Sequence, residues 1–70
     1  MKPCYIAWVG YTSIGIGTNI DRLLQSAQAT ISAPRWQAYT PGPAEVRITT
    51  YGTQRLISTH TIRPAEEDAR

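Results

Sequence analysis

The sequence predicts an α+β domain in which one amphipathic helix covers one face of a three-stranded antiparallel sheet. Three patterns indicate this fold: a helical apolar stripe over residues 18–33, a strand pattern over residues 4–11 and a hairpin pattern over residues 45–62. The elements follow the order β-α-β-β, and their short connections favour the sheet order 1-3-2. A chain of 70 residues holds one domain. We place it at residues 1–63, followed by an acidic flexible tail at residues 64–70.

The helix is the strongest periodic signal. Its apolar residues recur at the spacing of one helix face: Ile20, Leu23, Leu24, Ala27 and Ile31. Thr18 and Asp21 fit a capping box, and Asn19 is a competing N-cap. Pro34 ends the helix, because the residue before a proline is driven toward extended geometry.

Residues 4–11 have the β-branched and aromatic composition of a strand. Both of its faces are largely apolar, so we expect the strand to be covered on both sides or to meet a partner with one face. Trp8 is expected to fill the core, because tryptophan is highly buried on average. The glycine-rich residues 12–17 are predicted to be a loop. The run Gly15-Ile16-Gly17 raises an anion-binding loop as the alternative, but no P-loop or dinucleotide motif is present, which favours a plain connector.

Residues 35–44 are predicted to be irregular. Trp36 and Tyr39 are expected to anchor this segment onto the edge of the core. Pro41-Gly42 fits the two central positions of a type II turn, because proline favours the first and glycine the second.

Residues 45–62 alternate as a β-hairpin, and its register has two alternatives. A three-residue turn at Thr50-Tyr51-Gly52 pairs Val46 with Leu56 and places Leu56 in the core. A two-residue turn places Ile57 there instead, because a shift of one residue reverses every side chain. We favour the first register, which gathers the polar residues on the outer face. It also places two polar side chains inside, those of Ser58 and His60.

Residues that carry chemistry are few. Cys4 is the only cysteine and His60 the only histidine, which excludes an internal disulfide and a zinc site built from these residue types alone. A nucleophile–base pair of Cys4 and His60 is the only arrangement to weigh, and it is disfavoured because nothing orients it. We therefore predict no catalytic residue, no metal and no cofactor. A single cysteine, no secretory signal and no apolar run near the ~20 residues of a membrane span predict a cytoplasmic protein.

The uncovered face of the sheet is the candidate functional surface. One helix covers one face only, and the other face carries arginine and tyrosine, which are enriched at interfaces. The predicted partner-binding residues are Arg47, Tyr51 and Arg55, with Arg35 and Arg63 on the rim. These features predict a non-enzymatic protein-binding module, either a monomer or a homodimer. The alternative is a small nucleic-acid-binding domain that uses the same arginines, consistent with the net charge of +2.

The layout resembles the small phage-encoded anti-CRISPR proteins directed at type I surveillance complexes. The chain opens with Met1-Lys2 and a strand containing Tyr5-Ile6, continues with a loop and one helix, and ends with the hairpin that begins Val46-Arg47-Ile48. The resemblance covers most of the chain in element order and size, without a specific motif. It implies an inhibitor that docks on Cas subunits in the host cytosol. Only the Glu66-Glu67-Asp68 run is acidic, so the resemblance implies blocking by shape and aromatic contacts rather than by mimicry of DNA charge.

Overall fold

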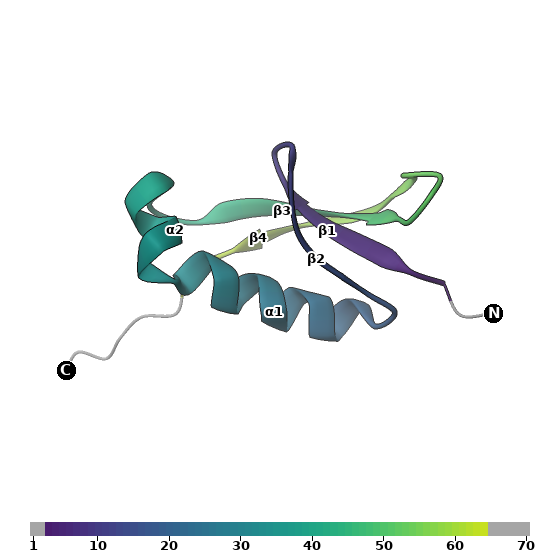
Figure 1. Cartoon of the computed structure of the whole chain (residues 1–70), viewed down its shortest axis with the longest axis horizontal. Coiled ribbons are helices and arrows are strands. Elements are labelled where there is room, and N and C mark those ends of the chain that lie inside the picture. The colour runs from purple at the N-terminus through teal and green to yellow at the C-terminus, as the bar shows by residue number, and fades with distance from the viewer. Residues whose placement is uncertain (1–2, 65–70) are drawn as a thin grey trace.

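The computed structural model describes residues 3–64 and shows a four-stranded antiparallel sheet with two helices (Figure 1). The elements are β1 (Tyr5–Val9), β2 (Thr12–Gly17), α1 (Ile20–Ser32), α2 (Pro34–Tyr39), β3 (Ala44–Thr50) and β4 (Leu56–Ile62). The strand order is β2-β1-β3-β4. The α+β class is confirmed, whereas the expected three strands in the order 1-3-2 are wrong. The predicted acidic tail, apart from Pro64, lies outside the described residues.

Residues 12–17, predicted to be a loop, form the edge strand β2. The strand pairs with β1 through a tight turn in which Gly10 has a φ of 62°. Gly15 is the partner of the buried Ala7 and therefore points toward α1. A Cβ added at Gly15 would lie 3.2 Å from Leu23 Cδ2. Here the glycines let the strand approach the helix closely, which is a packing role and not that of a flexible connector.

The sheet order differs from the expected one because β1 pairs with β3 rather than with β4. Ala7 lies opposite Ile48, and Tyr5 lies opposite Thr50. With β2 on its other side, β1 becomes a central strand, and every neighbouring pair in the sheet is antiparallel. The two strands that carry fully buried residues thus lie in the middle, and the strands rich in Thr, Ser and Gly lie at the edges.

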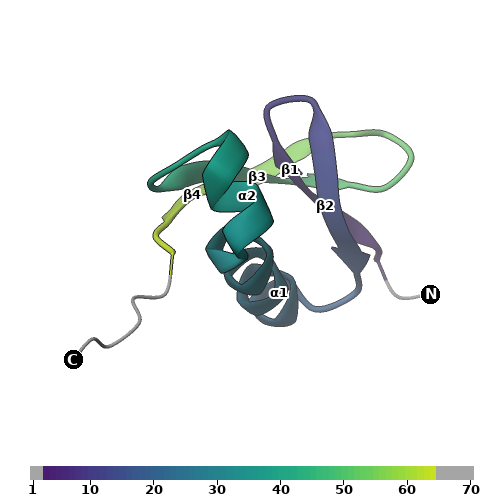
Figure 2. The same cartoon turned by 60° about the vertical axis from the view of Figure 1, so that its left-hand side comes forward.

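The core lies between α1 and one face of the sheet, as Figure 2 shows from the side. Its buried residues are Ala7, Leu23, Ala27, Ile31, Val46 and Ile48. The predicted helical stripe is confirmed, because three of its members are buried at a spacing of four residues. Asn19 is the N-cap, and its Oδ1 accepts a hydrogen bond from the backbone N–H of Arg22 at 3.1 Å. Asn19, and not Thr18, is therefore the N-cap of α1.

Residues 35–39, part of the segment 35–44 that was expected to be irregular, form the short helix α2 together with Pro34. Pro34 begins this helix, since a proline at the first helical position lacks only an N–H that would have no partner in the helix. The Gln37 side chain ties α2 down: its Nε2 donates to the Ile31 carbonyl at 2.6 Å, and its Oε1 accepts from the Gly42 N–H at 2.9 Å. Trp36 packs against the core as expected, but Tyr39 is 86% exposed and anchors nothing.

Neither predicted hairpin register is correct. Val46 pairs with His60, and Thr49 pairs with Leu56 across a five-residue loop, residues 51–55. Thr50 Oγ1 organises this loop, because it accepts from the Arg55 N–H at 3.0 Å and lies 2.6 Å from Thr53 Oγ1. A bulge follows in β4, so Leu56 and Ile57 are both exposed and neither enters the core.

Candidate interaction surface

The sheet face turned away from α1, which we call the open face, is built from two rows of cross-strand partners. Partners in an antiparallel sheet point to the same side, so the pairing fixes each row. One row is Ile16, Ile6, Thr49 and Leu56, and the other is Ser13, Trp8, Arg47 and Thr59. In Figure 1 α1 lies on the opposite side of the sheet.

The first row is mainly apolar and is most exposed at its two ends. Ile16 is 58% exposed on the edge strand β2, and Leu56 is 56% exposed on the edge strand β4. Between them, Thr49 is buried although it belongs to the open face. The exposed aliphatic side chains of this row thus lie at the two edges of the open face.

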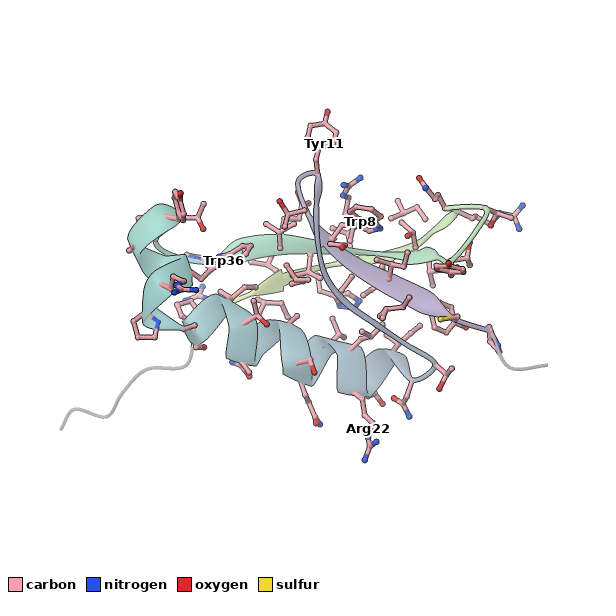
Figure 3. The ribbon with its side chains drawn as sticks, viewed as in Figure 1. Trp8, Tyr11, Arg22 and Trp36 are labelled. Carbon is pink, nitrogen blue, oxygen red and sulfur yellow. The ribbon has the colours of Figure 1, made fainter. Side chains whose placement is uncertain are left out.

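Trp8 was expected to fill the core, but it lies on the open face. Its Nε1–H donates to Thr49 Oγ1 at 2.8 Å, so the ring lies across the neighbouring strand and covers that threonine. Figure 3 shows Trp8 on the side of the sheet away from α1. The hydrogen bond fixes the ring, which becomes a rigid apolar part of the open face.

Arg47, a predicted contact residue, lies beside Trp8 in the second row. Its guanidinium donates a hydrogen bond to the Gly10 carbonyl in the β1–β2 turn, and the side chain is half-buried. This interaction links the middle of the sheet to that turn. Arg47 therefore supports the shape of the open face, and fewer of its donors are free for a partner.

The other predicted contact residues lie at two ends of the β3–β4 hairpin. Tyr51, 62% exposed, and Arg55 belong to the loop at one end. Arg35 on α2 and Arg63 after β4 lie toward the other end, because Ala44 follows α2 and pairs with Ile62. Figure 1 shows α2 and the β3–β4 loop at opposite ends of the molecule. The sheet thus separates residues that the sequence alone grouped together.

The sequence did not predict Ile16 or Leu56 as exposed residues of the open face. Ile16 and Leu56 were assigned to a loop and to the core. Tyr11, assigned to a strand, is 99% exposed at the tip of the β1–β2 turn and points away from the molecule (Figure 3). The alternation Ile14-Gly15-Ile16-Gly17 was the available signal for β2, since period two is typical of a strand with one packed face.

Cys4 and His60 do not meet. Cys4 lies opposite Tyr51 and shares the open face with Ile6, whereas His60 pairs with the buried Val46 on the helix side. His60 Nε2 lies 2.9 Å from Ser58 Oγ, so the two inward polar side chains satisfy each other. Residues 3–64 contain no group of three or more His, Cys, Asp or Glu side chains that could hold a metal ion.

Two open depressions lie beside α1, and Ile16 of the open face also lines the first of them. One of about 470 Å³ surrounds the start of α1 and includes Arg22, which points away from the sheet in Figure 3. The other, of about 320 Å³, lies where α1 meets α2 and is lined by Thr30, Ala33, Arg35, Trp36 and Tyr39. Neither lining holds a nucleophile beside a base.

The fold and the open face define a class, a small α+β domain with a half-covered antiparallel sheet. Comparison of the chain with protein-family models, with curated proteins and with solved structures gives no match. Neither helix in residues 3–64 combines the length and apolar character needed to cross a membrane.

Proposed function

We propose that this chain is a non-enzymatic protein-binding module that docks on a larger partner through its open face and the adjoining β3–β4 loop. The observation that carries the proposal is the exposed apolar row ending in Ile16 and Leu56, with the fixed Trp8 ring beside it. Fully burying one aliphatic side chain contributes about 1.5–3 kcal/mol, so covering two half-exposed ones contributes about 2 kcal/mol in total.

The loop beside this row supplies the polar part of the proposed interface. Tyr51 and Arg55 are exposed, and both residue types are enriched in the binding centres of interfaces. The Tyr51 N–H donates to the Cys4 carbonyl at 2.8 Å, which holds the loop against β1. A loop that is already ordered loses little conformational entropy on binding, which favours affinity.

The same residues give less support to nucleic-acid binding. Arg55 and Arg63 bracket β4 and lie roughly 25 Å apart at the ~3.3 Å rise of a strand. Arg47, between them, is bonded to Gly10. An electrostatic groove that follows a phosphate backbone needs several free cations along one path, and here the cation between the two ends is engaged by the Gly10 carbonyl.

Variants of the open face test this proposal. Ile16→Glu combined with Leu56→Glu places two carboxylates in the apolar row, and the matched control, Gln25→Glu with Ala29→Glu, places two on exposed positions of α1. Tagged wild-type chain should capture a defined partner from the lysate of its host. The control should retain that partner, and the open-face variant should lose it with an unchanged circular dichroism spectrum. Retention by both variants would contradict the proposal.

Substitution of the loop tests the proposed polar contacts separately. Tyr51→Ala with Arg55→Ala should weaken binding to the captured partner by at least about tenfold, because each side chain contributes on the order of 1 kcal/mol or more at a binding centre. The melting temperature should stay near the wild-type value, since both side chains are exposed. Wild-type affinity in a titration by calorimetry would remove the loop from the interface.

The proposed partner is a Cas subunit of a type I surveillance complex, a proposal supported by the likeness in element order and size to the anti-CRISPR proteins. Strand β2 and helix α2 depart from the strand, loop, helix and hairpin order on which that likeness was based. The test measures two activities of a purified surveillance complex with and without the chain. Fluorescence anisotropy measures its binding to target DNA, and a pull-down measures its recruitment of the nuclease. Unchanged DNA binding and unchanged nuclease recruitment would remove this partner and leave the open-face experiment to stand alone.

A further inference from the structure

The outer edge of β4 is a second surface, distinct from the open face. Strand β4 ends the sheet order, and among the described helices and strands it contacts only β3 and α1. An edge strand presents unpaired backbone donors and acceptors, which another strand can use.

The hydrogen-bonding pattern shows which residues of β4 present those groups. The Tyr51 N–H bonds to the Cys4 carbonyl, so Tyr51 and every second residue before it in β3 bond toward β1. The residues between them, including Val46 and Ile48, therefore bond toward His60 and Ser58 of β4. The backbone groups of Thr59 and Thr61 consequently point outward from the sheet.

This edge lacks the usual protection against pairing. Natural edge strands carry charged side chains, proline or a bulge that turns the edge away. Residues 56–62 contain no charged residue and no proline, and their bulge lies at the beginning of the strand, beside Ile57. The part of the edge from Ser58 to Ile62 is therefore regular and uncharged.

The sequence of β4 is also complementary to itself in the antiparallel direction. Thr59 is the central residue of Leu56–Ile62, so a two-fold axis there pairs the regular residues 58–60 of the two copies and places Thr61 opposite the second copy's Ile57, at the bulge. Ser58 then lies opposite the second copy's His60, a polar pair that the structure already shows in hydrogen-bonding contact within one chain. An axis nearer Thr61 overlaps less, because the Arg63 carbonyl already accepts from Gln28 Nε2 at 3.1 Å and Pro64 has no N–H.

We infer that two copies of this chain pair through β4 about a two-fold axis at Thr59, joining two four-stranded sheets into one eight-stranded sheet. The helices of both copies lie on the same face, and the two open faces become continuous. This inference is independent of the proposed partner, because it concerns the edge of the sheet and not its face.

Opposite charges at the symmetry axis test the inference sharply. A residue on a two-fold axis meets itself, so Thr59→Lys and Thr59→Glu each place like charges opposite one another, which destabilises a strand pair. Thr59 is exposed, and each variant should fold as wild type does. Each should raise the dimer dissociation constant at least about tenfold in analytical ultracentrifugation. An equimolar mixture should restore a dimer that native mass spectrometry identifies as one copy of each.

The matched control lies at the other end of the same cross-strand row. Ser13→Lys and Ser13→Glu put the same charges on the exposed edge strand β2 and should leave association unchanged. Arg55 and Arg63 flank β4, so measurements are made at physiological salt or above, where exposed charges are screened. A wild-type chain that stays monomeric at every concentration would overturn the inference. So would a dimer that the Thr59 variants leave intact, or a mixture that fails to form the mixed dimer.

Discussion

At the scale of single residues, the two tryptophans differ in how their polar atoms are satisfied. Trp8 Nε1–H donates to Thr49 Oγ1, whereas Trp36 Nε1 is buried with no hydrogen-bond partner among the described residues. A buried donor without a partner loses its hydration and gains nothing in return, at about 1–3 kcal/mol. The indole of Trp36 thus stabilises the fold through its buried apolar area, whereas that of Trp8 also stabilises it through a specific hydrogen bond.

Replacing each tryptophan by phenylalanine should separate these roles. Trp8→Phe should lower the free energy of unfolding by about 1–3 kcal/mol, because it removes the bond and leaves the Thr49 hydroxyl unpaired. Trp36→Phe should change it by less than about 1 kcal/mol, because release of the unpaired N–H offsets the lost indole area. Urea denaturation measures both values, and a larger loss in Trp36→Phe would contradict the argument.

At the scale of elements, β2 and the beginning of α1 show that one local sequence pattern is compatible with two different structures. Glycines in residues 12–17 favoured a loop, yet Gly15 faces Leu23 of α1, and a Cβ there would lie only 3.2 Å from Leu23 Cδ2. The beginning of α1 was equally ambiguous, with Thr18 and Asn19 both able to cap it. The structure assigns the cap to Asn19, whose side chain accepts from the third residue after it.

The cap provides a direct prediction for α1. Asn19→Ala should lower the free energy of unfolding by about 1 kcal/mol, because it removes the acceptor for an N–H at the start of the helix. Thr18→Ala should have an effect within about 0.5 kcal/mol, since Thr18 is exposed and is not the cap. Thermal denaturation of the two variants measures the difference, and the opposite order would restore the capping box with Asp21.

At the scale of the whole molecule, the described residues build one apolar layer, between α1 and one face of the sheet. The fully buried aliphatic residues, such as Ile31, Val46 and Ile48, all lie in this layer. The residues that stabilise the fold therefore lie on one face of these strands, and the proposed binding surface lies on the other.

Alanine substitutions on the two faces should reveal this division. Ile48→Ala should lower the free energy of unfolding by about 2–5 kcal/mol, which is much of the ~5 kcal/mol expected for a small domain. Leu56→Ala should lower it by less than about 1 kcal/mol, because the side chain is already more than half exposed. Similar losses in both variants, measured by urea denaturation, would show that the open face is not uncovered in solution.

Local patterns in the amino-acid sequence were enough to predict the elements that depend on residue spacing alone. The stripe from Ile20 to Ile31 predicted α1, and alternation predicted strands at both ends of the chain, because a helix and a strand each repeat at a fixed spacing. The alternation also placed Arg47 on the uncovered side of the sheet, as its pairing with Trp8 and Thr59 confirms.

The sheet order, the hairpin register and the residues of the open face depend on contacts that form only in the folded chain. The identity of Gly15 as a packing residue depends on Leu23 of α1, and the position of Leu56 depends on a bulge beside Ile57 and on a loop that Thr50 organises. Such features arise from contacts between residues far apart in the chain or from competing turns of similar energy, and local spacing does not distinguish them.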